Sequence, residues 1–262
     1  MSSGTDRLAA TGYGAGWSLA KALPEGLAER SFTAVADAAF RRRGPRTIQL
    51  ARNLHRVLGP DSTPAALAAV TRAGMRSYAR YWMETFRLPS MDKDAVATSF
   101  LDNLSGLSHA QAAMESGKGL IMSLTHSANW DIAGLGMVKA FGGFATVAER
   151  LHPASLYDKF VAYRESLGFE VLPFTGGDVN PTTVLRERLA QGKLICLVAD
   201  RDLSSRGVEI DFFGEPTRMP AGPAMLAAIT GAALCPTNLF FTDHGWAGEV
   251  APPVELAGGR RR

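Results

Sequence analysis

Short apolar runs alternate with helix-sized segments between residues 119 and 241. A buried strand shows as a short apolar run bounded by polar, Gly or Pro residues, whereas a helix repeats its apolar positions every 3–4 residues. Because helix-sized segments separate most of the predicted strands, we expect an α/β fold with a mixed, largely parallel central sheet flanked by helices. The predicted strands are 119–125, 144–148, 170–173, 194–199, 208–210 and 234–241, and the predicted helices are 130–141, 153–167, 180–191 and 222–230.

The first 90 residues show a different pattern, which predicts a helical N-terminal region. Ala, Leu and Arg dominate it, and Pro24, Gly44-Pro45 and Gly59-Pro60 interrupt the helical spacing. Its predicted helices are 12–22, 25–42, 46–58 and 63–86, and a further helix pair is expected in 91–118. The chain of 262 residues is long enough for one large domain, so we expect a single domain, 1–262, with a helical part, 1–90, and an α/β core, 91–262.

Charge is unevenly distributed between these two parts. Residues 1–90 hold 13 Lys and Arg against 6 Asp and Glu, a balance of +7, and the remainder has a balance of −4. A basic half suits an anionic partner, either a membrane or a nucleic acid. Arg41-Arg42-Arg43 would face anionic headgroups, although cations near a helix C-terminus are favourable in any protein and solvated Arg-rich faces remain the alternative. The apolar side of such a contact would comprise Tyr13, Trp17, Leu19, Leu23 and Leu27, which equally suit packing on the domain.

No segment predicts a membrane-spanning helix or a signal peptide. The longest uncharged run, 219–242, is broken by prolines and glycines, and residues 1–20 contain no continuous apolar stretch. Cys196 and Cys235 lie in predicted strands without metal-ligand spacing, which favours a reducing cytoplasm. We therefore expect a protein that lies on a membrane without crossing it.

His126 stands five positions before Asp131, directly after the predicted strand 119–125. On one continuous helix this spacing would turn the two side chains about 140° apart, so they cooperate only if His126 precedes the helix. Asn129 predicts the N-cap of helix 130–141, and Asp131 in its first turn suits the helix dipole. Ligand sites of open α/β sheets gather at the carboxyl ends of strands. An ordinary surface histidine beside a capping aspartate has the same pattern.

Polar clusters follow two further predicted strands. Glu149-Arg150 comes after 144–148, and Asp200-Arg201-Asp202 comes after 194–199. In a parallel sheet these strand ends converge, so we expect the two clusters to lie near His126. Ordinary surface ion pairs are the competing interpretation.

The sequence lacks the motifs of several other enzyme classes. It has no P-loop, no G-x-G-x-x-G after a strand and no G-x-S-x-G elbow. Ser127 is adjacent to His126 in the chain and cannot easily adopt serine–histidine geometry. The chain therefore offers a base without an activated nucleophile, which favours direct attack by a substrate hydroxyl.

The ordered set of motifs resembles the family of glycerolipid and lipid A acyltransferases, over about 65–250 of the chain. The His126-x4-Asp131 element is similar to the family's signature, and the resemblance is strongest to the branch that acylates phosphatidylinositol mannosides. The chain departs from the lipid A pattern in having no predicted N-terminal membrane span and no segment after the last strand, and the former favours a peripheral protein. The other matching elements are Glu149-Arg150, Arg164-x3-Gly168, Asp200-Arg201-Asp202 and the segments Asp211–Gly214, Met219–Ala224 and Thr230–Ala232.

The resemblance implies a mechanism in which His126 acts as general base on a sugar hydroxyl that attacks the thioester of a long-chain acyl-CoA. Either Asp131 or Asp200 would orient the imidazole, and the residues alone leave both open. No metal and no cofactor beyond the acyl-CoA co-substrate is implied. Residues implied at the acyl-CoA are His126, Arg164, Arg206, Met225 and Ile229, of which the last two equally suit core packing, and those implied at the acceptor are Glu149, Arg150, Arg201 and Asp202.

The expected function is transfer of a palmitoyl-like chain to a mannose of a phosphatidylinositol mannoside, by a peripheral, monomeric protein at the cytoplasmic face of the plasma membrane. Its expected partners are acyl-CoA, a glycolipid acceptor and an anionic membrane surface, without nucleic acid. The carboxylates Glu149, Asp200 and Asp202 favour a sugar over the phosphate of a lysophosphatidate. The alternatives are another lipid acceptor such as a lipid A precursor, an acyl-CoA hydrolase, and a non-catalytic adaptor that uses the basic half.

Overall fold

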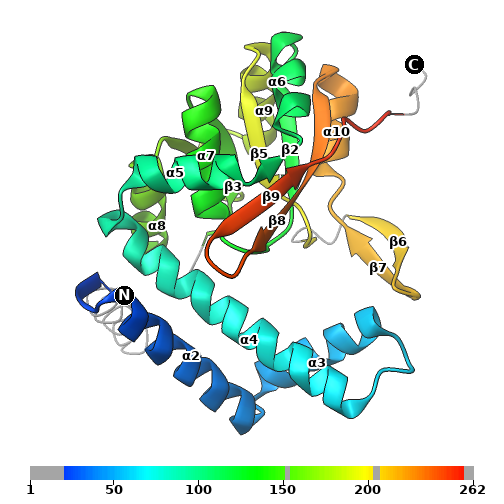
Figure 1. Ribbon diagram of the computed structural model, residues 1–262. Helices are drawn as coiled ribbons and strands as arrows, with labels where there is room; N and C mark the ends of the chain where they lie inside the picture. The colour runs from blue at the N-terminus through cyan, green and yellow to red at the C-terminus, as the bar shows by residue number, and fades with distance from the viewer. Residues whose placement is uncertain (1–20, 151–153, 203–206, 257–262) are drawn as a thin grey trace. The chain divides into compact units, whose positions relative to one another are not determined.

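A computed structural model describes residues 21–150, 154–202 and 207–256 (Figure 1). These residues form two compact units. One contains Asp92–Val208 and the chain from Arg218 onward, and the other contains the described residues up to Met91 together with Glu209–Thr217. Each unit is described separately below.

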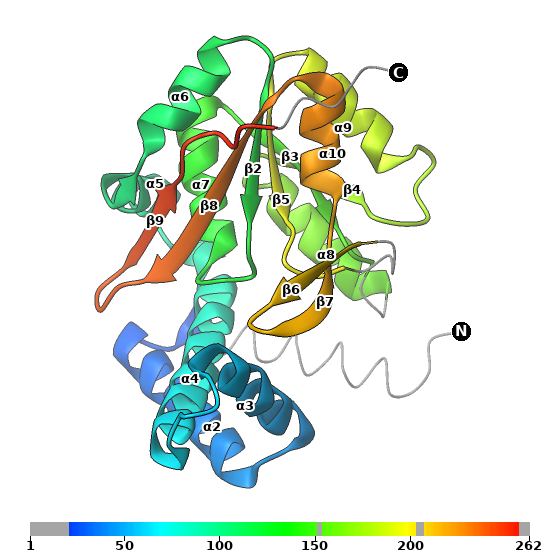
Figure 2. The same cartoon turned by 90° about the vertical axis from the view of Figure 1, so that its right-hand side faces the viewer.

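The larger unit is built on a seven-stranded sheet with the order β1-β9-β8-β2-β5-β3-β4 (Figure 2). The five strands from β8 to β4 are parallel to their neighbours, β9 is antiparallel to β8, and β1 is parallel to β9. The predicted mixed, largely parallel sheet is therefore confirmed. The strands are β1 (Leu104–Ser105), β2 (Leu120–Leu124), β3 (Phe144–Ala148), β4 (Phe169–Pro173), β5 (Leu194–Val198), β8 (Ala233–Phe241) and β9 (Trp246–Val250).

Helices cover both faces of this sheet (Figure 2). The first face carries α5 (Lys93–Asp102), α6 (Leu107–Glu115) and α7 (Trp130–Phe141), and the second carries α9 (Pro181–Ala190) and α10 (Gly222–Thr230). A further helix, α8 (Ala154–Glu165), packs beside β4. The predicted helices in this unit are confirmed to within a few residues of their ends.

The core between the sheet and α9/α10 is apolar because alternate residues of the central strands face it. Ile121 of β2 and Ile195 of β5 are fully buried there, and they are direct partners in the parallel register. The two cysteines of the chain, Cys196 and Cys235, are free thiols at buried strand positions. Such burial of large aliphatic side chains is the main stabilising contribution to the sheet.

On the other face, α7 packs closely because two of its residues are glycines. A Cβ on Gly136 would come within 2.6 Å of Cδ1 of Phe100 on α5, and a Cβ on Gly134 would overlap the ring of Phe169 on β4. The aromatic rings of Phe100 and Phe169 therefore occupy the space that side chains on α7 would need. These glycines serve packing, which agrees with the absence of a dinucleotide motif.

The smaller unit contains three helices: α2 (Glu25–Arg42), α3 (Pro45–Leu58) and α4 (Pro64–Arg87), followed by a short 3₁₀ turn, η1 (Leu88–Ser90). The buried carboxylate of Asp37 on α2 accepts hydrogen bonds from both Arg72 and Arg76, one turn apart on α4. Hydrogen bonds from Arg76 and Arg72 hold the pKa of Asp37 far below its ordinary value. This cluster fastens α2 to α4.

The predicted N-terminal helices at 25–42, 46–58 and 63–86 are confirmed, whereas most of 12–22, with Tyr13, Trp17 and Leu19, lies outside the described residues. Leu27 is half exposed, and Arg41, Arg42 and Arg43 are all exposed at the end of α2. Within the part of the chain that the structure describes, no helix has the length and apolar character needed to cross a bilayer.

A separate two-stranded hairpin, β6 (Val208–Phe212) and β7 (Glu215–Met219), follows β5. Its turn is Phe213-Gly214, both with positive φ, and the rings of Phe212 and Phe213 are about half exposed. Strand β6 was predicted in part, but β7, β9 and the two-residue β1 were not. Strand β1 has only two residues, and β7 is exposed along almost its whole length, so neither shows an alternation of apolar and polar positions.

Candidate active site

His126 and Asp200 meet at the carboxyl edge of the sheet because β2 and β5 are adjacent and parallel. The register pairs Leu124 with Val198, and the amide of Ala199 donates to the carbonyl of Leu124 at 2.9 Å. Two residues beyond these ends, Nδ1 of His126 lies 2.6 Å from Oδ1 of Asp200. The backbone N–H of His126 donates to Oδ2 of the same carboxylate at 3.2 Å.

The Asp200 contact determines how the imidazole presents itself. Burial by itself would raise the pKa of Asp200, but hydrogen bonds from the ring and backbone of His126 outweigh it and leave the pKa below its ordinary value. The ionised carboxylate can only accept, so Nδ1 of His126 carries the shared proton, and in the neutral form of the ring the lone pair is then on Nε2. The His126 side chain is 40% exposed, so a substrate can reach it. A neutral, oriented imidazole with an available Nε2 is suited to act as a general base.

The loop between β2 and α7 supports this orientation. Asn129 is the N-cap of α7, as predicted, and its side chain accepts from the amide of Ile132 at 3.3 Å. Ala128 adopts a φ of 46°, which is uncommon for a residue with a Cβ, so the loop is held in an unusual conformation. The ring of Trp130 contacts the His126 ring edge to face, with centroids 5.2 Å apart and planes at 86°. Trp130 is a neighbour that the sequence analysis did not identify.

Asp131 has a different partner. Its side chain is fully buried in the first turn of α7, and Oδ1 accepts from Nε of Arg164 on α8 at 2.8 Å, with a longer contact of 3.5 Å from Nη2 to Oδ2. Of the two carboxylates that the sequence left open as partners of the imidazole, Asp200 is therefore the one in contact. Asp131 and Arg164 instead form an ion pair that ties α7 to α8.

The convergence of strand ends is confirmed, because β5 lies between β2 and β3 in the sheet. Arg201 after β5 lies 3.9 Å from Glu149 after β3, and both side chains are exposed, so this is a weak ion pair. Arg150 donates to the carbonyl of Gly176 at 2.6 Å and lies over the ring of Tyr157. This part of the site is open to solvent, and it contains both acidic and basic side chains.

The remaining predicted residues are more scattered. Asp202 accepts from the amide of Gly207 at 2.8 Å. Arg206 itself lies outside the described residues. Met225 and Ile229 are exposed by 57% and 56% on α10, so they are surface residues of that helix and not part of its buried side.

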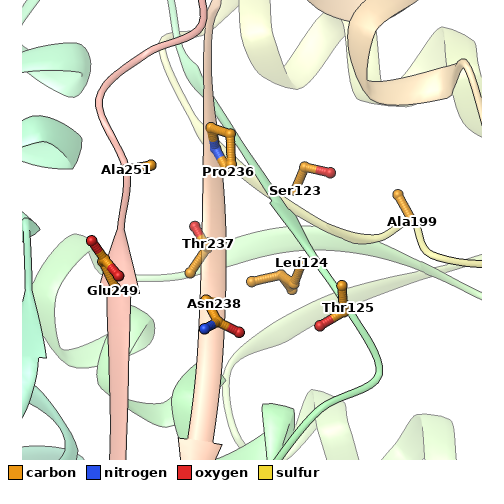
Figure 3. A pocket seen from close by; sticks show the side chains of 9 residues that line it. All are labelled: Ser123, Leu124, Thr125, Ala199, Pro236, Thr237, Asn238, Glu249 and Ala251. Atoms are coloured by element: carbon orange, nitrogen blue, oxygen red, sulfur yellow. The ribbon is translucent and has the colours of Figure 1, made fainter. Parts of the chain in front are cut away.

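A cavity of about 410 Å³ is lined in part by Thr125 and Ala199, which directly precede His126 and Asp200 in the chain (Figure 3). It opens between the carboxyl ends of β2 and β5 and the antiparallel β8–β9 pair. Sequence reasoning missed it because β9, which completes its wall, was not predicted. The residues that line it are Ser123, Leu124, Thr125, Ala199, Pro236, Thr237, Asn238, Glu249 and Ala251.

Comparison of the whole sequence with known protein families assigns this chain to a class of enzyme. A family model described as bacterial lipid A biosynthesis acyltransferase matches residues 7–259. The chain therefore belongs to this acyltransferase family, and the resemblance drawn from its motifs is confirmed.

Two individual relatives with more specific names match most of the chain. The chain is 50% identical over 250 residues to a protein named phosphatidylinositol mannoside acyltransferase from Mycolicibacterium smegmatis, covering 95% of this chain and 80% of that one. It is 49% identical over 249 residues to a protein of the same name from Mycobacterium tuberculosis H37Rv, covering 94% and 77%.

Proposed function

We propose that this acyltransferase transfers a long-chain, palmitoyl-like acyl group from acyl-CoA to a mannose hydroxyl of a phosphatidylinositol mannoside. The observation that carries the proposal is the contact of 2.6 Å between Nδ1 of His126 and Asp200, which leaves Nε2 as the base. The acceptor class follows the printed names of relatives that share about half of the chain's residues. Acyl-CoA is proposed as the donor because the resemblance of the motifs to the acyltransferase family implies it.

In the proposed reaction, Nε2 of His126 removes the proton of the sugar hydroxyl as its oxygen attacks the thioester carbonyl. The tetrahedral intermediate collapses with cleavage of the C–S bond, and the imidazolium returns its proton to the departing CoA thiolate. Asp200 stabilises the imidazolium and fixes the tautomer. General-base catalysis of this kind contributes about 10²–10⁴-fold to the rate.

We assign the other charged residues by their contacts. Asp131 and Arg164 act as positioning residues, because their buried ion pair holds the start of α7, where the His126 loop ends. Glu149, Arg150, Arg201 and Asp202 form the polar arm that would meet the acceptor. Arg206 is proposed to meet the CoA phosphates, since Arg binds phosphate well. The exposed Met225 and Ile229 are proposed as a wall for the acyl chain.

The place of the reaction is proposed as the cytoplasmic face of the plasma membrane, with the protein as a peripheral monomer. Two observations support a membrane surface: the basic residues Arg41, Arg42 and Arg43 are exposed, and apolar side chains such as Val35 are exposed on the same helix. Anionic headgroups attract such basic segments.

The test is CoA release from palmitoyl-CoA, with and without purified phosphatidylinositol mannosides, by wild type, His126→Ala and the control His244→Ala, an exposed histidine in the β8–β9 turn. Acceptor-stimulated release by wild type and the control, lost in His126→Ala, supports the proposal. Release that no acceptor stimulates indicates a hydrolase. Equal release by all three proteins, or none, favours the adaptor and contradicts the proposal.

A further inference from the structure

The cavity beside His126 contains polar side chains that the proposed mechanism does not use. Ser123 comes from β2, Asn238 from β8 and Glu249 from β9, and Asn238 and Glu249 are cross-strand partners in the antiparallel register (Figure 3). Within residues 21–150, 154–202 and 207–256, these three side chains form no hydrogen bond or ion pair. Three different strands therefore supply polar groups whose hydrogen-bonding capacity is available to a ligand.

The lining of the cavity includes the residues that come directly before the reactive pair in the chain. Thr125 and Ala199 both line it, and they immediately precede His126 and Asp200 in the chain. A ligand in the cavity is thereby placed at the same edge of the sheet as the imidazole. Its volume of about 410 Å³ lies within the range of small-molecule sites, about 300–1,000 Å³.

We propose that this cavity binds the sugar ring of the acceptor, with Ser123, Asn238 and Glu249 hydrogen-bonding its hydroxyls. This inference rests on the proposed function and extends it by naming the subsite that receives the acceptor. Each sugar hydroxyl both donates and accepts, and the lining matches that need: the carboxylate accepts, the amide does both and the serine hydroxyl does both. The apolar atoms of Leu124, Pro236 and Ala251 provide contacts for the C–H groups of the ring.

The same lining disfavours the binding of acyl-CoA in this cavity, either by its acyl chain or by its phosphates. An acyl chain in this cavity would desolvate the Glu249 carboxylate without offering it a hydrogen bond, which is unfavourable. The CoA phosphates would be repelled by the same negative charge. A neutral, hydroxyl-rich ring has neither disadvantage.

The kinetic test compares wild type, Asn238→Ala, Glu249→Gln and the control Glu255→Gln, an exposed glutamate that does not line the cavity. Transfer rates are measured against phosphatidylinositol mannoside concentration at saturating palmitoyl-CoA. We expect the acceptor KM to rise about tenfold in each cavity variant, the loss typical of one hydrogen bond, with the control unchanged. An acceptor KM within about twofold of wild type in both variants, or a rise in the palmitoyl-CoA KM instead, overturns the inference.

A binding test separates this inference from the proposed function. The catalytically impaired His126→Ala protein is titrated with the deacylated, water-soluble glycerophosphoinositol mannoside, and saturation-transfer NMR reports contact with its sugar protons. We expect binding that weakens about tenfold when Glu249→Gln or Asn238→Ala is added. Absence of binding, or binding that both changes leave intact, overturns the inference. Binding to the cavity without any transfer by wild type refutes the proposed function alone.

Discussion

Nδ1 of His126 lies 2.6 Å from Oδ1 of Asp200, although 74 residues separate them in the chain. The parallel pairing of β2 with β5 produces this contact, and the second carboxylate oxygen accepts from the backbone of His126. Asp131, which is five residues away, is instead paired with Arg164. The two aspartates therefore have separable tasks, which the first two predictions distinguish.

Replacing Asp200 should impair catalysis without unfolding the protein. In Asp200→Asn the neutral amide no longer stabilises an imidazolium or selects the tautomer, so we expect acceptor-dependent CoA release to fall about 10²–10⁴-fold. The melting temperature, followed by circular dichroism, should stay close to that of wild type because Asp200 is partly exposed. An active Asp200→Asn protein would show that the His126 contact has no part in the reaction.

Replacing Asp131 should instead destabilise the fold. Asp131→Asn leaves Arg164 with a neutral partner in a buried position, and breaking such a pair costs about 3 kcal/mol. Denaturant unfolding would measure this loss of free energy of unfolding. The double variant Asp131→Asn/Arg164→Gln should lose less than the sum of the two single variants, since neither charge is left unpaired. Additive losses would mean that the two side chains do not interact.

The glycine of α7 that packs on Phe100 should not tolerate alanine. The Cβ of Gly136→Ala would approach Cδ1 of Phe100 to 2.6 Å, and we expect a loss of about 1–3 kcal/mol in the free energy of unfolding. Gly26→Ala is the matched change on α2, where no atom lies within 4 Å of the new Cβ. That control should be neutral or slightly stabilising, since alanine favours helices over glycine. Equal effects would show that crowding at Phe100 is not the cause.

The Asp37 cluster should make stability depend on pH. Its lowered pKa means that the stabilisation is fully present above the ordinary value of 3.8 and is lost as pH falls through the lower folded value. Asp37→Asn should therefore lower the melting temperature of the protein at pH 7, with a difference from wild type that shrinks as the pH falls below 3.8. Asp61→Asn, at an exposed turn, is the control. A difference that stays constant with pH would exclude the ionised carboxylate as the source.

Neutralising the arginines at the end of α2 should weaken membrane binding. Arg41, Arg42 and Arg43 are exposed, and each basic residue near an anionic surface contributes about 1 kcal/mol. Co-sedimentation of the triple Gln variant with anionic vesicles should fall sharply, and wild-type binding should weaken with added salt. The control carries the same charge change at exposed sites in the larger unit, as Lys118→Gln/Arg186→Gln/Lys193→Gln. Loss of binding in both variants would point to net charge and not to this segment.

Local sequence signals predicted the helices well. The ends of α2, α7 and α10 match the predicted 25–42, 130–141 and 222–230, because prolines, Asn129 and glycines mark them. The central strands were equally clear, since burial on both faces makes them continuous apolar runs. These elements are specified by residues close together in the chain.

Features that depend on distant segments were not predictable in the same way. The spacing from His126 to Asp131 drew attention to the neighbouring carboxylate, whereas the order of β2 and β5 in the sheet determines that Asp200 is the partner. Strand β9 has five residues and lies between β1 and β8, so its contribution of Glu249 to the cavity emerges only from pairing with β8. Sheet order and edge pairing are tertiary properties that periodicity does not encode.

His126 and Asp200 follow β2 and β5, two of the strands whose backbone is best protected from solvent in the larger unit. Leu120, Ile121, Leu194 and Ile195 on these strands are almost completely buried, and amides in such strands exchange with solvent only through global opening. The backbone positions from which the imidazole and its carboxylate extend are therefore held in place for as long as the sheet is intact. On heating, enzymatic activity should persist until the cooperative unfolding transition and disappear with it, so that activity serves as a reporter of the intact sheet.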